Sequence, residues 1–164
     1  STNGIWSTDA NPFNARDRRR TERHWDFTAL LRNDPSDTLT FEAGFARKTR
    51  SPNLYERYAW STQSMAALMN NFVGDGNGYI GNPDLRPETA HTVSLSGDWH
   101  DAFRERWGLK ASTYYTYVTD FIDARRCGFG QCGGTANLTR TNGFVLLQFA
   151  NADAQLYGLD VSGN

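Results

Sequence analysis

The feature that most limits what this chain can fold into is a series of strand-like runs joined by alternately short and long connections. Six runs alternate apolar and polar residues, at 24–32, 38–49, 89–101, 106–122, 144–151 and 155–164. Side chains of a strand point to opposite faces in turn, so each run predicts a sheet with one apolar face. Compact soluble domains seldom contain unstructured connections as long as 50–88 or 123–143.

Periodicity alone leaves two classes of sheet open. In the run at 106–122, Leu109, Ala111 and Tyr115 alternate with Lys110 and Ser112. A soluble antiparallel sheet with one buried face shows the same pattern. Membrane barrels, however, join their strands by short periplasmic turns and long outer loops. The connections therefore favour an antiparallel up-and-down transmembrane β-barrel. We predict periplasmic turns at 33–37, 102–105 and 152–154, and outer loops at 1–23, 50–88 and 123–143.

Aromatic residues agree with this interpretation. Trp99 and Trp107 flank the short connection at 102–105, and Tyr115 and Tyr117 lie toward the opposite end of their run. Amphipathic rings favour the two membrane interfaces. Six strands are fewer than the roughly 8 that close a membrane barrel, and open edges in lipid leave backbone groups unpaired. We therefore expect residues 1–164 to be part of one larger β-barrel domain, with further strands on both sides.

Composition excludes several classes of protein. Charged residues make up 21% of the chain and the formal net charge is -1, which argues against a nucleic-acid partner. Aromatic residues (13%) and 15 glycines favour strands and turns. The sequence has no apolar run near the roughly 20 residues of a spanning helix. It also lacks catalytic motifs and paired acid–base carboxylates, so we expect no enzyme activity. The sequence assigns no cofactor to the chain.

The two cysteines, Cys127 and Cys132, lie in the glycine-rich segment RRCGFGQCGG. Glycines allow the tight turn that a bond between the two sulfurs requires. We favour a disulfide, which places the segment in an oxidising compartment. A thiolate metal site and two free thiols are the alternatives.

The segment NPDLRPETA, residues 82–90, combines two prolines with the start of an alternating run. Proline fixes φ near −65° and cannot donate to a ladder, so it suits the entry to a strand. The segment is therefore predicted to be a stiff lead-in to a strand that begins at Thr89. By parity Glu88 lies on the polar, lumen-facing side, where Arg86 is a candidate partner.

This segment resembles the barrel signature of TonB-dependent outer-membrane receptors, in which an Asn-Pro-x-Leu-x-Pro-Glu run precedes a strand. GFARKTRSPNLYERY (44–58), TYYTYVTDFIDA (113–124) and FANADAQLYGLDVSGN (149–164) are similar to other family segments, with Asp160 in place of the usual Glu. The resemblance covers about residues 24–164. The residues that match the signature are Asn82, Pro83, Leu85, Pro87 and Glu88.

The resemblance implies a plugged barrel of roughly twenty-two strands in the bacterial outer membrane. It also implies import of a scarce ligand with energy relayed by TonB, which is binding and passage without bond making. The chain shows no plug and no TonB box. We expect TonB to be contacted through an N-terminal region that is missing from this chain, which we interpret as a fragment.

The segment SMAALMNNFVGDGNGYIGNPDL, followed by DWHDA, is similar to the copper-receptor branch of the family. Met65 and Met69 are four residues apart, so a helical turn would align their thioethers, which suit Cu(I). Ordinary packing within the loop is the alternative. The expected ligand is thus copper, or else a metal chelate.

Two further segments have both a functional and a structural interpretation. Tyr55, Tyr58 and Trp60 in LYERYAW either line an outer ligand vestibule or pack the loop onto itself. The basic cluster ARDRRRTER, residues 15–23, either contacts lipopolysaccharide phosphates at the membrane surface or forms a solvated face with local pairing of Asp17 and Glu22.

Two other functions compete with the transporter interpretation. One is a soluble antiparallel β-sandwich that binds glycans through exposed aromatic rings. The other is an adhesin-like surface barrel without a transport role. The first requires the apolar residues Phe41, Leu95, Leu109 and Tyr115 to pack against a second layer, whereas a membrane barrel leaves them facing lipid.

Overall fold

The computed structural model describes residues 7–17, 19–61, 69, 74–103, 106–132 and 145–164. Within this part of the chain, no helix has the length and apolar character needed to cross a bilayer. The elements are α1 (Ser7–Asn14), β1 (Phe27–Ser36), β2 (Leu39–Arg50), α2 (Leu54–Tyr58), β3 (Gly78–Ile80), β4 (Glu88–His100), β5 (Gly108–Arg126) and β6 (Leu146–Gly163).

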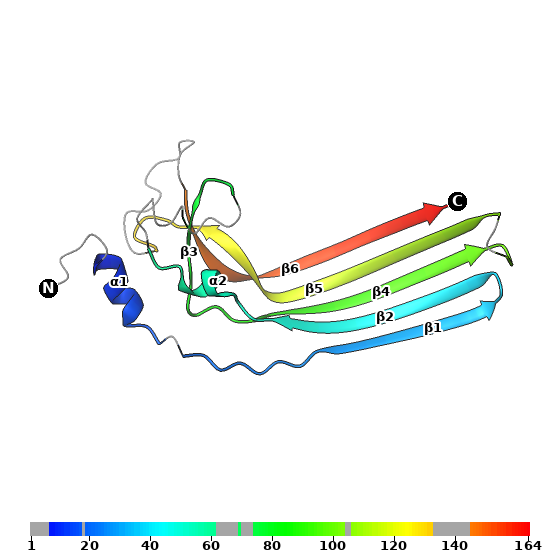
Figure 1. Ribbon diagram of the computed structural model, residues 1–164, viewed down its shortest axis with the longest axis horizontal. Helices are drawn as coiled ribbons and strands as arrows, with labels where there is room; N and C mark the ends of the chain where they lie inside the picture. Colours follow the sequence, from blue (N-terminus) through cyan, green and yellow to red (C-terminus); the bar gives the residue numbers. More distant parts are fainter. Residues whose placement is uncertain (1–6, 18, 62–68, 70–73, 104–105, 133–144) are drawn as a thin grey trace. The chain divides into compact units, whose positions relative to one another are not determined.

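The strands form one sheet in the order β1-β2-β4-β5-β6-β3. Strands β1, β2, β4 and β5 pair as antiparallel neighbours and lie side by side (Figure 1). The chain divides into two compact units. The sheet unit comprises 23–50, 88–121 and 153–164, and the loop unit comprises 1–22, 51–87 and 122–152. The predicted antiparallel sheet is confirmed.

Register assigns each side chain of the sheet unit to one of two faces. Directly paired residues of β2, β4 and β5 share a face, which gives rows of three side chains. We call the face formed by the following four rows the apolar face: Leu39–Trp99–Leu109, Phe41–Gly97–Ala111, Ala43–Leu95–Thr113 and Phe45–Val93–Tyr115.

The apolar face is not covered by the described residues. Phe41 is 49% exposed, Leu95 is 55% exposed, and Leu109 and Tyr115 are each 46% exposed. A β-sandwich would bury these side chains against a second sheet. Their exposure fits a wall whose apolar face meets lipid, and it does not support the sandwich alternative.

The intervening residues form the polar face. Its rows are Thr40–Asp98–Lys110, Glu42–Ser96–Ser112, Gly44–Ser94–Tyr114 and Ala46–Thr92–Thr116. The hydroxyls of Thr92 and Thr116 lie 2.8 Å apart, and Arg32 Nη1 is 3.8 Å from Glu42 Oε1. Such groups need water or polar partners, so this face suits an aqueous lumen.

The first predicted turn, at 33–37, is only partly correct. Strand β1 continues to Ser36, so the first turn is the pair Asp37–Thr38 rather than all of 33–37. A register shift between Asn33 and Ser36 accommodates the proline of this segment. At the second connection Trp99 and Trp107 meet edge to face, with ring centroids 4.8 Å apart, as expected for an interfacial girdle.

The predicted turn at 152–154 is wrong, because β6 runs through it without a break. The segment contains no glycine or proline that would force a turn. The Asp153 carboxylate instead accepts hydrogen bonds from the Tyr117 hydroxyl at 3.2 Å and the Asp120 backbone N–H at 3.4 Å. These contacts accommodate a polar residue within the strand, so two predicted strands are one.

The loop unit contains elements that periodicity did not predict. Strand β3 pairs in parallel with the first residues of β6, from Gly78↔Leu146 to Ile80↔Gln148. All three of its residues are buried. Three residues are too few to show an alternating pattern, and α2, with five residues, is too short to show a helical one.

We predict that Leu95→Lys destabilises the folded full-length protein by ~2–4 kcal/mol, because a charge on the lipid face near mid-strand is costly. The matched change Ser96→Lys, one residue along on the polar face, is expected to have little effect. Thermal unfolding of both variants in lipid vesicles measures the difference. Equal destabilisation by the two changes would contradict the assignment of the faces.

Candidate functional site

The predicted vestibule residues belong to the loop unit, where α2 holds two of them, Tyr55 and Tyr58. Asn53 and Glu56 form a capping box: the Glu56 backbone N–H donates to Asn53 Oδ1 and the Asn53 N–H to Glu56 Oε2, each at 2.8 Å. The cap fixes where this short helix begins. Tyr55 is consequently displayed on the surface, 56% exposed.

The other predicted vestibule residues are less exposed. Tyr58 is half-buried, and Trp60 is 36% exposed with its ring centroid 6.5 Å from that of Phe13. The contact between Trp60 and Phe13 agrees with packing within the loop unit, and the ligand vestibule stays a prediction. Tyr55 is displayed to the solvent, whereas Trp60 also packs within the unit.

Arg57, which sequence reasoning did not single out, is a buried charged residue of this unit, as is its neighbour Glu56. It is 7% exposed, forms an ion pair with Glu22, and donates from Nη2 to the Leu85 carbonyl oxygen at 3.1 Å. Its Nε has no hydrogen-bond partner among the described residues. Glu22 lies far from Arg57 in the sequence, so no local pattern could have predicted the pair.

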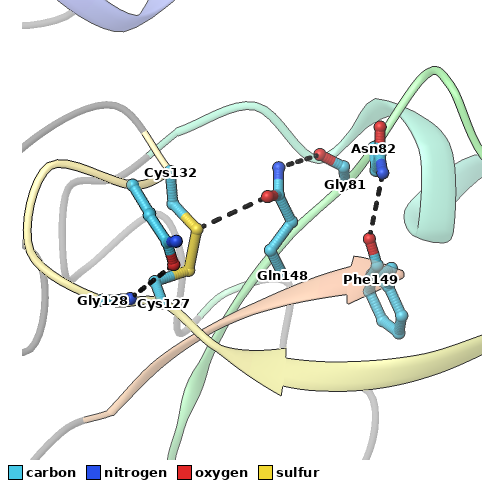
Figure 2. Close-up of a disulfide and its surroundings, with 8 residues drawn as sticks. Gly81, Asn82, Cys127, Gly128, Cys132, Gln148 and Phe149 are labelled. Carbon is cyan, nitrogen blue, oxygen red and sulfur yellow. Dashed lines mark hydrogen bonds between the residues drawn. A yellow bond between two sulfur atoms is a disulfide. The ribbon is translucent and has the colours of Figure 1, made fainter. Parts of the chain in front are cut away.

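Asn82, the first residue of the family signature, joins three segments of the loop unit. Its backbone N–H donates to the Glu56 carbonyl oxygen at 2.8 Å. Its Nδ2 donates to the Phe149 carbonyl oxygen at 3.2 Å, as Figure 2 shows. Its Oδ1 accepts the Asp84 N–H at 3.0 Å. An amide side chain supplies both the donor and the acceptor that this position requires.

The apolar residues of the signature build the core of the unit. Pro83 is fully buried, and Leu85, 3% exposed, packs with Tyr79, Ile122 and Phe149. Tyr79 and Phe149 stack with ring centroids 5.6 Å apart. The apolar signature residues Pro83 and Leu85 thus act by burial and packing within the loop unit.

The end of the signature leads directly into β4. The backbone of Arg86 exchanges two hydrogen bonds of 2.9 Å with the Asn151 side chain. After Pro87, Glu88 begins β4 on the polar face, as predicted, and its Oε1 accepts from Arg50 Nε at 2.6 Å. Arg50 is its cross-strand neighbour, a partner that the sequence alone could not reveal.

Cys127 and Cys132 are joined by a disulfide, with their Cα atoms 6.0 Å apart (Figure 2). Cys127 is buried with Ile80 and Leu146. Gln148 lies beside this bridge and donates from Nε2 to the Gly81 carbonyl oxygen at 3.4 Å. The bridge therefore belongs to the same packed structure as the lead-in.

The loop before β3 is held by Asp75. Its carboxylate accepts hydrogen bonds from the Tyr79 hydroxyl at 2.6 Å and from the Asn77 backbone N–H at 3.0 Å. The Tyr79 bond is the main cause that lowers the pKa of Asp75. Burial first, and then the Asp75 bond, raise the pKa of Tyr79 to about 12. Tyr79 thus stabilises the fold fully below its unfolded pKa of about 10, and this contribution is lost as pH rises through about 12.

The structure does not test the methionine pair. Met65 lies outside the described residues, and Met69 is 83% exposed. Among the described residues, no group of three or more His, Cys, Asp or Glu side chains could hold a metal ion.

The basic cluster at 15–23 is engaged with residues far from it in the sequence. Arg20 Nη2 is 2.6 Å from Asp84 Oδ1, and Glu22 pairs with Arg57. Within the cluster, the Arg19 backbone N–H donates to Asp17 Oδ1 at 3.0 Å.

We predict that Gly81→Ala disrupts the lead-in. A Cβ at Gly81 would lie 2.5–2.7 Å from backbone atoms of Arg57 and Ala59, and backbone cannot move aside cheaply. Overpacking of this kind costs ~1–3 kcal/mol. In Gly97→Ala, the control, the nearest contact is 3.5 Å, from Phe41. Limited proteolysis of the full-length variants should show faster cleavage within 51–87 for Gly81→Ala only.

The chain matches the family described as TonB dependent receptor-like, beta-barrel, over residues 5–164. It is 29% identical over 129 residues to Heme/hemopexin utilization protein C of Haemophilus influenzae (strain 86-028NP), covering 75% of this chain and 17% of that protein. Among solved structures, the siderophore receptor PirA of Pseudomonas aeruginosa aligns with a TM-score of 0.58 and 20% identity, covering 84% of this chain and 24% of PirA.

The hemophore receptor HasR of Serratia marcescens, solved with its hemophore HasA and heme, aligns with a TM-score of 0.54 and 16% identity, covering 85% of this chain and 19% of HasR. This chain therefore spans about a fifth of the length of these relatives. Members of the matched family are outer-membrane receptors rather than enzymes, in agreement with the sequence. The chain belongs to the TonB-dependent receptor family, and it forms part of the family's β-barrel in the bacterial outer membrane.

Proposed function

We propose that the protein containing this chain is a transporter that binds a scarce metal chelate, such as heme or a ferric siderophore, and imports it with energy delivered by TonB. The observation that carries this proposal is the two-faced sheet, which has an exposed apolar face and a polar face in one register. A wall of this kind separates lipid from an aqueous lumen through which a polar ligand can pass. The names of the related receptors support heme and siderophores as ligand classes.

The proposed partners follow from the same assignment. TonB is the partner of the whole receptor, and outer-membrane lipid and lipopolysaccharide surround its wall. We further propose that Tyr55, with Tyr58 and Trp60 beside it, contributes to an outer vestibule for the ligand. Exposed aromatic rings suit chelates that are themselves aromatic.

Expression of the full-length protein in a Gram-negative host without its own heme and siderophore receptors tests transport. We expect growth on heme or on a ferric catecholate as the sole iron source, and we expect that growth to disappear when TonB is deleted. Uptake that persists without TonB would contradict the proposal. Failure to use any chelate, despite correct insertion in the membrane, would favour the adhesin alternative.

A second prediction concerns the vestibule. Tyr55→Ala should weaken ligand binding about 2- to 10-fold, since an aromatic contact contributes roughly 0.5–1.5 kcal/mol. Tyr157→Ala is the matched control, because Tyr157 is also exposed, at 79%, but lies in the sheet unit. Titration of the purified full-length receptor with heme measures both affinities. Equal affinities would remove Tyr55 from the vestibule.

Copper is the finer proposal for the cargo, and it rests on the sequence segment that holds Met65 and Met69. To test this proposal, Cu(I) accumulation is measured in the same host with the natural receptor and with a variant in which leucine replaces both methionines. Unchanged accumulation would exclude these two residues as copper ligands.

A further inference from the structure

The apolar face of the sheet ends at a row of different chemistry. Beyond Phe45–Val93–Tyr115, the next row on this face is Arg47–His91–Tyr117, and the row after that is Thr49–Thr89–Thr119. Four apolar rows are thus followed by a cationic and aromatic row and then by hydroxyls. We call Arg47, His91 and Tyr117 the boundary row.

The boundary row lies at a spacing that fits a membrane interface. From Leu109 to Tyr117 along β5 the strand rises ~27 Å, and a tilt of about 40° reduces this to ~21 Å across the membrane. The apolar band of an outer-membrane barrel is about 25 Å tall. Trp99 and Trp107 mark the opposite limit of the band, so the boundary row falls where headgroups replace acyl chains.

Arg47 is held in place beside the expected headgroups. Its guanidinium lies 3.9 Å from the centroid of the Trp25 ring, and Nη1 donates to the Trp25 carbonyl oxygen. Stacking on an aromatic ring orients a guanidinium while leaving its charge in place. Trp25 itself is 63% exposed, which suits an interfacial indole.

His91 is the direct cross-strand neighbour of Arg47 and is half-buried. Its ring makes no hydrogen bond with any residue that the structure describes. Two acidic groups lie near the row, and both accept hydrogen bonds: Asp26 from the Thr49 N–H at 2.9 Å and Asp153 from the Tyr117 hydroxyl. The His91 imidazole has no such acidic partner, and it lies next to the fixed guanidinium of Arg47 on the lipid-facing wall. The two groups therefore offer adjacent hydrogen-bond donors to an anion.

We propose that Arg47 and His91 bind a phosphate group of lipopolysaccharide in the outer leaflet. The row lies at the end of the strands from which the long connections leave, which is the outer side of a membrane barrel. This site differs from the basic cluster at 15–23, where Arg20 is paired with Asp84. The inference rests on the outer-membrane location and not on the identity of the transported ligand.

The test uses the full-length receptor, purified in detergent, stripped of lipid and titrated with rough-type lipopolysaccharide. Arg47→Gln should weaken binding about tenfold or more, because charge-assisted hydrogen bonds to phosphate are lost. His91→Gln should weaken binding in the same direction without disturbing the contact with Trp25. Lys48→Gln, the neighbouring residue whose side chain lies on the polar face, removes the same charge and should leave affinity unchanged.

Two further ligands identify the bound group. Dephosphorylated lipopolysaccharide should bind the natural receptor at least as weakly as intact lipopolysaccharide binds the Arg47→Gln variant, and inorganic phosphate should not compete at equal concentration. The proposal is overturned if Arg47→Gln and His91→Gln both bind like Lys48→Gln. It is also overturned if dephosphorylation has no effect, or if free phosphate competes fully. The test measures binding and needs no transport assay, so its result does not depend on whether the receptor imports a ligand.

Discussion

The backbone ladder that joins β2, β4 and β5 in one unbroken register is the constraint on which the rest of this structure depends. In hydrocarbon, every N–H and C=O must find a partner within the protein, and a strand finds these partners only by pairing along its whole length with its neighbours. The same ladder decides which side chains meet lipid. A slip of one residue would turn Glu42 and Lys110 toward acyl chains, so a location in the membrane requires this register.

The loop unit meets a different requirement, because its backbone cannot rely on a long ladder. Its order comes from a small core around Leu85 and Phe149, from a disulfide, and from side chains that bond directly to backbone. The side chains of Asn82 and Asn151 each form a hydrogen bond with the backbone of a segment distant in the sequence. The family signature is therefore explained by folding, and ligand recognition is left to exposed residues such as Tyr55.

Sequence periodicity predicted the long strands because the alternation of apolar and polar residues continues over many residues in each. It failed where this alternation was short or interrupted. Strand β3 is too short to show a period. The polar residues around Asp153 have the sequence pattern of a turn, but hydrogen bonds such as that from Tyr117 keep this segment in β6. Among site residues, the lead-in at 82–88 was foreseen from proline chemistry. The pairs Arg57–Glu22 and Glu88–Arg50 were not, because their members are distant in the chain.

By itself, the sequence determined the two faces of the sheet, the alternation of short and long connections, the stiff entry to β4 and a pair of cysteines able to bridge. These properties depend on neighbours one or two residues apart, where backbone geometry is decisive. Only the tertiary structure decided which residues stand side by side, including the boundary row that places Arg47 against His91. Such contacts depend on register between distant strands, and register is settled by the pairing of whole strands rather than by any local pattern.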